Sequence, residues 1–345
     1  MSYDTRFYGL DFAYTQLNGM PYVRLGASGL KVSRVGLGTW KMGYPERRDG
    51  SRVDRDTSLG ILDRALELGV TFWDTANRYN ESSGNSERVL GEWFRAHPAE
   101  RRNIVLATKM GGCMDGVTPN HGGLSRANVL ESVYASLDRL GLEYIDLLQF
   151  HRIDSEVPVE ESLEAVADLR QRDLVRYFGL SNATVSDLEQ YRRIAREFRL
   201  PVVSSVQNGF NPLTGAQAAQ QEALPYCAEH GVSFIAYSPL LRGLLTNRYL
   251  KGATVGAGDR LVDEGALERL TNDQVYARLD RLAGLAGKLG LTVAQLSLAY
   301  MRYLPGMGPL IPSASTVAQL EENAASGTVE LDAEVLGELR TIFVS

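Results

Sequence analysis

Four side chains with complementary acid–base properties lie at or just beyond the ends of short apolar runs: Asp74, Tyr79, Lys109 and His151. A tyrosine, with an unperturbed pKa of about 10, is a weak proton donor near pH 7. A nearby ammonium group favours the phenolate and lowers that pKa, and Lys109 carries such a group. We therefore interpret Tyr79 as a proton donor that Lys109 activates.

Asp74 and His151 have supporting roles in this interpretation. A carboxylate beside Lys109 would keep the ammonium charged and oriented. A neutral imidazole at His151 could donate a hydrogen bond to a carbonyl oxygen and fix its position. Each of these residue types at a strand end is more often structural than catalytic. Together, they are typical of a site that adds a hydride to a carbonyl carbon and a proton to the developing alkoxide.

A second group of polar and aromatic residues follows later apolar runs. The amides of Asn182 and Gln207 could hold the carboxamide of a nicotinamide. Tyr237 offers an aromatic face on which a nicotinamide ring could stack. The pattern therefore predicts a nicotinamide cofactor next to the proton donor.

Short runs rich in β-branched residues alternate with amphipathic stretches along the chain. The runs span 32–40, 71–76, 104–109, 144–151, 175–182, 202–210, 232–239 and 309–313. Helical spacing of apolar residues is seen at 56–68, 128–140, 160–172, 185–198 and 274–289. This repeated alternation predicts parallel strands. The fold class that we expect is α/β, as a (β/α)8 barrel.

An open doubly wound sheet is the alternative, but a dinucleotide-binding sheet wants a GxGxxG turn, and VGLGTW (35–40) lacks the third glycine. In a barrel, functional groups gather at the C-terminal ends of the strands. We expect those ends at Trp40, Ala76, Lys109, His151, Asn182, Phe210, Pro239 and Ser313.

Two segments fall outside the repeat. The arm 21–33 predicts a hairpin around Ser28 and Gly29, preceded by an N-terminal extension over residues 1–19 that could cover the barrel bottom, reach a partner subunit or be disordered. The Gly-rich segment 240–272 predicts a long loop after the seventh strand, of the kind that forms lids or binding loops. With no linker in between, residues 1–345 are expected to form a single domain.

Charge, cysteine content and hydropathy argue against several classes of protein. The formal net charge of −6 argues against nucleic-acid binding, which depends on Lys and Arg neutralising phosphates. The two cysteines, Cys113 and Cys227, fit a reduced compartment. No apolar stretch has the length of a membrane helix, and the first residues lack the apolar core of a signal peptide. We expect a cytoplasmic protein with neither nucleic-acid nor membrane partners.

Several motifs, read in order, resemble the aldo-keto reductase superfamily. They are GLGTW, FWDTANRY, SERVLGEWF, IVLATK, YIDLLQFHR, FGLSN and IPSASTVAQLEEN, from about residue 20 to about residue 325. The resemblance implies a catalytic tetrad at Asp74, Tyr79, Lys109 and His151. It implies nicotinamide contacts at Ser181, Asn182 and Gln207, with stacking by Tyr237. It further implies cofactor or pocket contacts at Gly38, Thr39, Trp40, Ser238, Leu240, Arg242, Ser313, Ser315, Thr316, Gln319 and Asn323.

Within that superfamily, the chain looks most like bacterial members related to potassium-channel β-subunits and sugar reductases. Relatives that prefer the phosphorylated cofactor usually carry Lys or Arg in the turn after the eighth strand, and 311–325 contains neither. A 2′-phosphate would then rely on the hydroxyls of Ser313, Ser315 and Thr316 and on a helix N-terminus. We expect NADP(H) ahead of NAD(H), with NAD(H) still open.

The predicted function is therefore NAD(P)H-dependent reduction of a small aldehyde or ketone, with a sugar or keto sugar among the candidate substrates. The alternative is a nicotinamide-binding regulatory subunit with little or no turnover. A metal-assisted barrel hydrolase is disfavoured, because His151 is the only histidine at a predicted strand end and we expect no metal site. The pattern predicts no particular oligomeric state.

Overall fold

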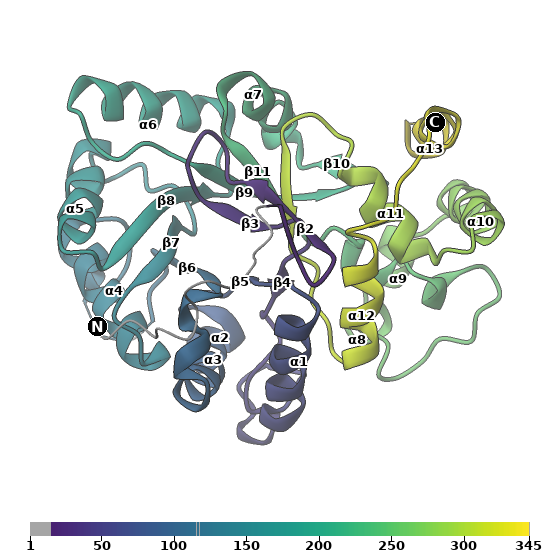
Figure 1. The fold of residues 1–345 in the computed structure, drawn as a ribbon, viewed down its shortest axis with the longest axis horizontal. Helices are drawn as coiled ribbons and strands as arrows, with labels where there is room; N and C mark the ends of the chain where they lie inside the picture. Colours follow the sequence, from purple (N-terminus) through teal and green to yellow (C-terminus); the bar gives the residue numbers. More distant parts are fainter. Residues whose placement is uncertain (1–14, 115, 117, 345) are drawn as a thin grey trace, which may run out of the picture.

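The computed structural model describes residues 15–114, 116 and 118–344, and a barrel of parallel strands lies at its centre (Figure 1). Eight strands pair in the order β12-β11-β9-β8-β7-β6-β5-β4. Parallel bridges from Val35 to Leu310 and from Gly38 to Ser313 join the two ends of this sheet. The predicted (β/α)8 barrel is therefore confirmed. Its strands are β4 (Leu37–Gly38), β5 (Phe72–Asp74), β6 (Val105–Met110), β7 (Ile145–Phe150), β8 (Val175–Ser181), β9 (Ser205–Asn211), β11 (Ser233–Tyr237) and β12 (Met307–Leu310).

Every barrel strand ends within three residues of its predicted end. The largest difference is in β12, which ends at Leu310 instead of Ser313. Pro312 comes two residues later, and a proline has no backbone N–H with which to continue a strand ladder. Its carbonyl still accepts a hydrogen bond from the Gly38 amide at 3.1 Å, which helps to join β12 to β4.

Helices surround the barrel (Figure 1). The five predicted helices are present, each within two residues of its predicted bounds: α1 (Arg55–Glu67), α4 (Arg126–Leu140), α5 (Val159–Gln171), α6 (Val185–Glu197) and α10 (Asp273–Lys288). Capping residues set the ends of these helices. Ser125 caps α4 by accepting a hydrogen bond from the Asn128 amide, and Gly141 ends it with a φ of 65°. The longer of the remaining helices are α3 (Asn85–Ala96), α7 (Ala223–His230), α11 (Val293–Met301), α12 (Val317–Ala325) and α13 (Ala333–Val344).

A hairpin closes the N-terminal end of the barrel. The strands β2 (Met20–Arg24) and β3 (Lys31–Ser33) pair antiparallel, as predicted, and Ala27 at the tip donates a backbone hydrogen bond to Gly231. Leu25 and Val32 pack inside the barrel against apolar side chains of its lower strands. The short strand β1 (Gln16–Leu17) pairs with β2, whereas residues 1–14 of the predicted extension lie outside the described residues.

The segment 240–272, predicted as a long loop after the seventh strand, has secondary structure of its own. It contains the short helices η6 (Leu241–Gly243), η7 (Asn247–Tyr249), α8 (Arg260–Asp263) and α9 (Leu267–Leu270). Its leucines decide this outcome, because Leu244, Leu245 and Leu261 are fully buried in a cluster with residues of α10 and α13. The segment is therefore anchored against the outer helices.

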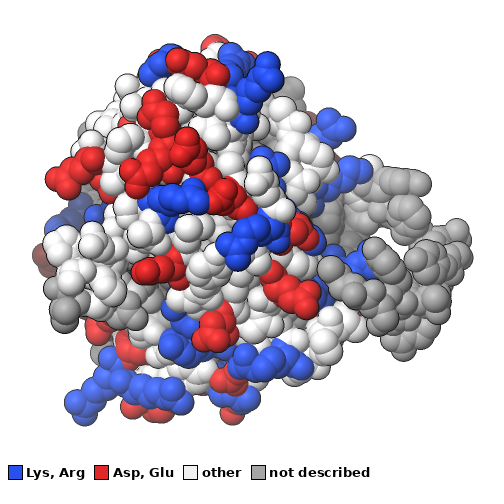
Figure 2. All heavy atoms as spheres, turned by 90° about the vertical axis from the view of Figure 1, so that its left-hand side faces the viewer, with Lys and Arg blue, Asp and Glu red and all other residues white. Residues whose placement is uncertain are grey.

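Charged side chains of both signs are interspersed on the face drawn in Figure 2, and neither sign forms a continuous stripe there. Among the described residues, no single helix is both long and apolar enough to cross a membrane. The bent pair α10 and α11 meets those criteria only when the two helices are taken together, across a bend of 93°.

Candidate active site

Along three neighbouring strands, the side chains that face the barrel interior change from apolar to polar within two residue positions. Alternate residues of a strand face the same side, so an inward-facing residue is followed by another two positions later. Phe72, Ala107 and Leu147 belong to the buried apolar cluster near the hairpin. Two positions further along β5, β6 and β7, buried polar side chains take their place: Asp74, Lys109 and Gln149.

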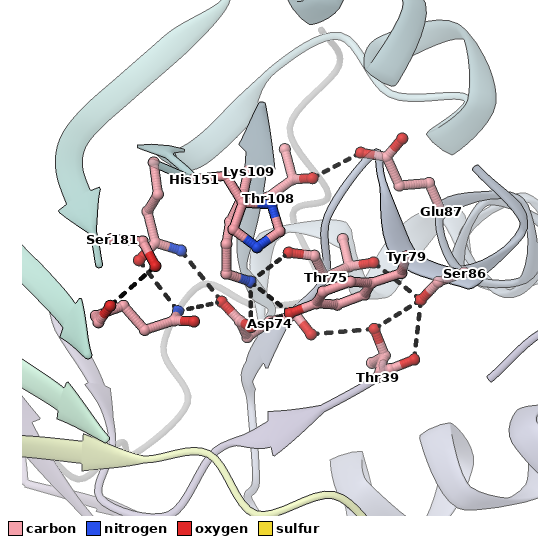
Figure 3. Close-up of polar contacts among 12 residues, drawn as sticks. Thr39, Asp74, Thr75, Tyr79, Ser86, Glu87, Thr108, Lys109, His151 and Ser181 are labelled. Carbon is pink, nitrogen blue, oxygen red and sulfur yellow. Dashed lines mark hydrogen bonds and ion pairs between the residues drawn. The ribbon is translucent and has the colours of Figure 1, made fainter. Parts of the chain in front are cut away.

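Lys109 is the centre of this polar layer. Its Nζ donates to Asp74 Oδ1 at 2.6 Å, to Tyr79 Oη at 2.7 Å and to the Thr75 carbonyl at 2.8 Å (Figure 3). Only 1% of Lys109 is exposed, and Asp74 is fully buried. An ammonium has three donors, so all of its hydrogen bonds are made inside the protein.

The other oxygen of Asp74 receives two amides. Gln207 Nε2 lies 2.7 Å from Asp74 Oδ2, and Gln149 Nε2 lies 3.1 Å from the same atom. Gln207 was predicted to contact the nicotinamide. Gln149 was not among the predicted site residues. A signal existed, since Gln149 is the only amide in the apolar strand β7 and points inward with Leu147.

The pKa of Tyr79 does not follow the expected direction. Burial and the adjacent Asp74 carboxylate, which lies 3.3 Å from the Tyr79 hydroxyl, raise this pKa well above its usual value of 10. We expected Lys109 to lower it. Desolvation is the largest cause, and the Asp74 carboxylate acts in the same direction. Tyr79 therefore holds its proton as a neutral phenol.

His151 lies beside Tyr79, with 6.0 Å between the ring centroids in an edge-to-face arrangement. Burial, together with the positive charges of Lys109, Arg152 and Arg78, lowers the pKa of His151 to about 3. The imidazole is therefore neutral near pH 7, the protonation state that the sequence analysis expected for a hydrogen-bond donor.

Helix α3 supports the polar layer from behind. Ser86 Oγ lies 2.9 Å from Thr39 Oγ1 and 3.0 Å from Thr75 Oγ1 (Figure 3). Glu87 accepts a hydrogen bond from Thr108 at 2.6 Å. The Thr39 hydroxyl also donates to the Asp74 carbonyl at 3.0 Å, so Thr39 supports strand β5 instead of facing the cavity.

A cavity of about 1290 Å³ opens above the polar layer. Most of the predicted site residues line it: Gly38, Trp40, Asp74, Tyr79, His151, Ser181, Asn182, Gln207, Tyr237, Ser238, Arg242 and Ser313. The predicted residues outside its lining are Thr39, Lys109, Leu240, Ser315, Thr316, Gln319 and Asn323. Among the lining residues that were not predicted are three arginines and a glutamine: Arg78, Arg152, Arg260 and Gln220.

The wall formed by β8, β9 and β11 suits a flat amide-bearing ring. Asn182 Nδ2 donates to the His151 carbonyl at 2.9 Å, and the Tyr237 hydroxyl donates to Asn182 Oδ1 at 2.9 Å. A Cβ at Gly209 would lie 3.1 Å from the Tyr237 ring, so a glycine allows the ring to lie close to β9. These contacts place an aromatic face beside the Asn182 amide and the Ser181 hydroxyl, and that hydroxyl donates to the Gln207 carbonyl at 2.9 Å.

The turn after β12 and the segment after β11 lie at the other end of the cavity wall. Thr316 caps α12 by accepting from the Gln319 amide at 3.2 Å, and both of these residues are exposed. Arg242 and Arg260 supply the positive charge that the turn lacks, and each forms an ion pair with Glu264, at 3.0 and 2.9 Å. Hydroxyls, a helix N-terminus and arginines together suit the phosphates of a dinucleotide.

Backbone strain is concentrated at this end of the barrel. Of the eleven non-glycine residues with positive φ in the described chain, seven lie in the turns around the cavity: Asn80, Glu81, Ser82, Asn182, Ser238, Leu241 and Arg242. Such conformations are costly and gather at functional sites. Among the described residues, no group of three His, Cys, Asp or Glu side chains is arranged to hold a metal ion.

The chain matches a known protein family and several known proteins. The model of the aldo/keto reductase family matches residues 34–343. The chain is 33% identical to versiconal hemiacetal acetate reductase from Aspergillus parasiticus, over 94% of this chain and 97% of that protein. It is 32% identical to YrpG, an uncharacterized oxidoreductase of Bacillus subtilis, over 94% of this chain and 96% of that protein.

A further relative carries a different kind of name. The chain is 32% identical to a protein of Arabidopsis thaliana named as a probable voltage-gated potassium channel subunit beta, over 88% of this chain and 90% of that protein. Proteins named as reductases and as channel subunits are thus both similar to this chain, and the chain belongs to the aldo/keto reductase family.

Proposed function

We propose that the protein reduces an aldehyde or ketone to an alcohol with a nicotinamide cofactor, and that Tyr79 is the proton donor. The observation that carries this proposal is the position of Lys109 Nζ, which lies 2.6 Å from Asp74 Oδ1 and 2.7 Å from Tyr79 Oη. Tyr79 and His151 both line the cavity directly above this pair. A carbonyl oxygen between their side chains would meet two hydrogen-bond donors.

Each side chain then has a separate task. A bound reduced nicotinamide supplies the hydride that is added to the carbonyl carbon. Neutral His151 donates a hydrogen bond that positions the carbonyl oxygen. The phenol of Tyr79 transfers its proton to the oxygen as negative charge develops there. Lys109 stabilises the resulting phenolate through its hydrogen bond, and Asp74 keeps the ammonium in place.

The cofactor would lie along the β8, β9 and β11 wall. Ser181 and Asn182 would hold the carboxamide, Tyr237 would stack on the ring, and Arg242 would meet the phosphates. Gln207 also lines this wall, although its amide nitrogen is committed to Asp74. We propose NADP(H) ahead of NAD(H), with Ser313, Ser315 and Thr316 near the 2′-phosphate.

Replacing Tyr79 with phenylalanine tests the proton donor. The change removes one oxygen atom, so folding and cofactor binding should persist while turnover falls by about 10²–10⁴-fold. The measurement is oxidation of NADPH with a panel of aldehydes, ketones and keto sugars, next to a cofactor fluorescence titration. If Tyr79→Phe kept most of its activity while binding cofactor normally, another group would have to supply the proton.

A single surface charge tests the cofactor preference. Gln319 is exposed at the start of α12, so Gln319→Arg places a guanidinium where a 2′-phosphate would lie. A charge-assisted hydrogen bond of this kind contributes about 1.5–3 kcal/mol, and less where solvent reaches it. NADPH binding should tighten relative to NADH binding in competitive titrations. Equal tightening of both cofactors would place the 2′-phosphate elsewhere.

The names of the channel-subunit relatives support a second candidate, a nicotinamide-binding regulatory subunit with little turnover. One measurement distinguishes the two proposals. A regulatory subunit would bind the cofactor tightly but oxidise it slowly with every carbonyl compound in the panel. We further propose that the chain acts as a single barrel domain in the cytoplasm on a small carbonyl compound.

A further inference from the structure

The cavity contains two kinds of arginine. Arg242 and Arg260, near the segment after β11, share the carboxylate of Glu264. Arg78 donates only to the neutral hydroxyl of Ser82, at 3.0 Å, among the described residues. Arg152 lines the same cavity, is exposed and forms no hydrogen bond or ion pair within the described part of the chain. The second pair therefore presents guanidinium groups to the cavity without an ion-pair partner among the described residues.

Among the described residues, no carboxylate forms an ion pair with Arg78 or Arg152, although Glu81, Asp154 and Glu156 line the same cavity. Asp154 lines the cavity, but its two oxygens accept the backbone amides of Leu124, at 2.9 Å, and Glu156, at 3.0 Å. The Glu81 side chain packs against Gly50, and its charge acts on Lys41. Glu156 is exposed and forms no ion pair among the described residues. In a chain with a net charge of −6, a basic site of this kind requires a specific explanation.

The position of the pair points to the substrate. Arg78 precedes Tyr79 in the sequence, and Arg152 follows His151, so both extend from the turns that carry the two carbonyl-binding side chains. Both positive charges act on the His151 ring, and that of Arg152 also acts on Tyr237. The paired arginines, in contrast, lie on the segment where cofactor phosphates would be held.

A buried amide adds an independent polar contact. Gln220 lines the cavity and is 6% exposed, and its Oε1 has no hydrogen-bond partner. A buried acceptor without a partner is costly unless a ligand or water donates to it. A hydroxyl group on the substrate would satisfy this oxygen.

We propose that the substrate is a carbonyl compound that carries an oxyanion, a carboxylate or a phosphate, which Arg78 and Arg152 bind. This inference rests on the proposed function. Guanidinium groups match both oxyanions through paired hydrogen bonds. An uncharged carbonyl compound of equal size would offer these arginines only neutral acceptors and no opposite charge, so charge is the basis of selection.

Matched substrates test the proposal. One pair is 4-formylbenzoate and its methyl ester, and the other is glyceraldehyde 3-phosphate and glyceraldehyde. With saturating NADPH, we expect at least one anionic member to have a kcat/KM about tenfold higher than its neutral partner, mainly through KM. This factor allows for the solvent exposure of the arginines. The pair with the larger ratio identifies carboxylate or phosphate as the anion.

Three variants locate the anion site. Arg152→Gln and Arg78→Gln should each reduce the anionic-to-neutral ratio of kcat/KM severalfold. Arg242→Gln is the matched control, and it should weaken cofactor binding without changing that ratio. A wild type that uses both members of each pair equally would overturn the inference. The same conclusion would follow if only the Arg242 variant removed the preference.

A binding measurement separates this inference from the proposed reduction. Calorimetry at low salt compares benzoate with benzamide, and inorganic phosphate with no added anion, on the wild type and on Arg152→Gln. Anion binding that depends on Arg152, without turnover of any carbonyl, would support the anion site and defeat the proposed reduction. Turnover without anion preference in either assay would do the reverse.

Discussion

Two layers inside the same barrel differ in polarity, although they lie only two positions apart along each strand. Near the hairpin, Leu147 and its neighbours fill the interior with apolar side chains. At the opposite end, Lys109, Asp74 and Gln149 bury charges and amides within hydrogen-bond distance of one another. The first layer stabilises the fold through removal of apolar surface from water.

The polar layer must offset the cost of desolvating its charges. A buried ion pair often contributes little net stability, whereas loss of one partner is strongly destabilising. Lys109 and Asp74 are therefore better explained by function than by stability. A barrel can thus separate stability from function along its axis. Alternate residues of one strand face the same interior, but at different levels.

The largest effect is expected for Lys109→Met. This change leaves the Asp74 carboxylate buried without its charged partner, which costs about 3–5 kcal/mol of stability. Turnover should also fall by at least the factor expected for Tyr79→Phe, because Tyr79 loses its hydrogen bond from the ammonium. Urea unfolding and NADPH oxidation measure the two effects.

A second substitution separates the loss of stability in Lys109→Met from its loss of activity. Adding Asp74→Asn to Lys109→Met removes the orphaned charge, so part of the stability should return while activity stays low. If activity returned with stability, Lys109 would act only through folding, and the functional contrast between the layers would be lost.

The apolar layer should show the opposite behaviour. Leu147 is fully buried, so Leu147→Ala removes apolar volume and should cost about 2–5 kcal/mol. Turnover per folded molecule should stay within a few-fold of the wild type, because the side chain lies below the polar layer. A loss of kcat as large as that of Lys109→Met would show that the layers are not functionally separate.

The smallest expected effect is a pH dependence of stability due to His151. Its pKa is about 3 in the folded chain and about 6.5 when unfolded, so the unfolded state binds more protons between these values. Stability should therefore fall as the pH decreases below about 6.5, by at most about 1.4 kcal/mol per pH unit from this group.

Urea unfolding of the wild type and of His151→Asn, at several pH values between 5 and 8, measures this slope. The difference in stability between the two proteins should change with pH only below about 6.5. A constant difference over the whole range would mean that His151 titrates normally in the folded protein.

Alternating runs and helical periodicity sufficed to predict the barrel, its strand ends and five of its helices. These features depend on local spacing, which the chain carries by itself. The same spacing predicted that Asp74, Tyr79 and His151 would gather at one end, because parallel strands in a barrel bring their C-terminal ends together. The hairpin at Ser28 and Gly29 likewise followed from local turn chemistry.

Other properties depend on distances between residues far apart in the sequence. The raised pKa of Tyr79 results from burial and from Asp74, which pairs with Lys109 at 2.6 Å. Thr39 lies behind the cavity because its hydroxyl bonds to strand β5 and to Ser86 on α3. Arg260 lines the cavity because its segment, 240–272, is held in place by buried leucines.

The sequence by itself determined the eight strands, five of the helices and which end of the barrel is polar, because strand and helix periods are local. Only the tertiary structure decided which polar groups face the cavity, which support it from behind, and which arginines lack a carboxylate. Charge compensation and desolvation depend on the full surroundings of each group, and residues from many elements contribute to those surroundings.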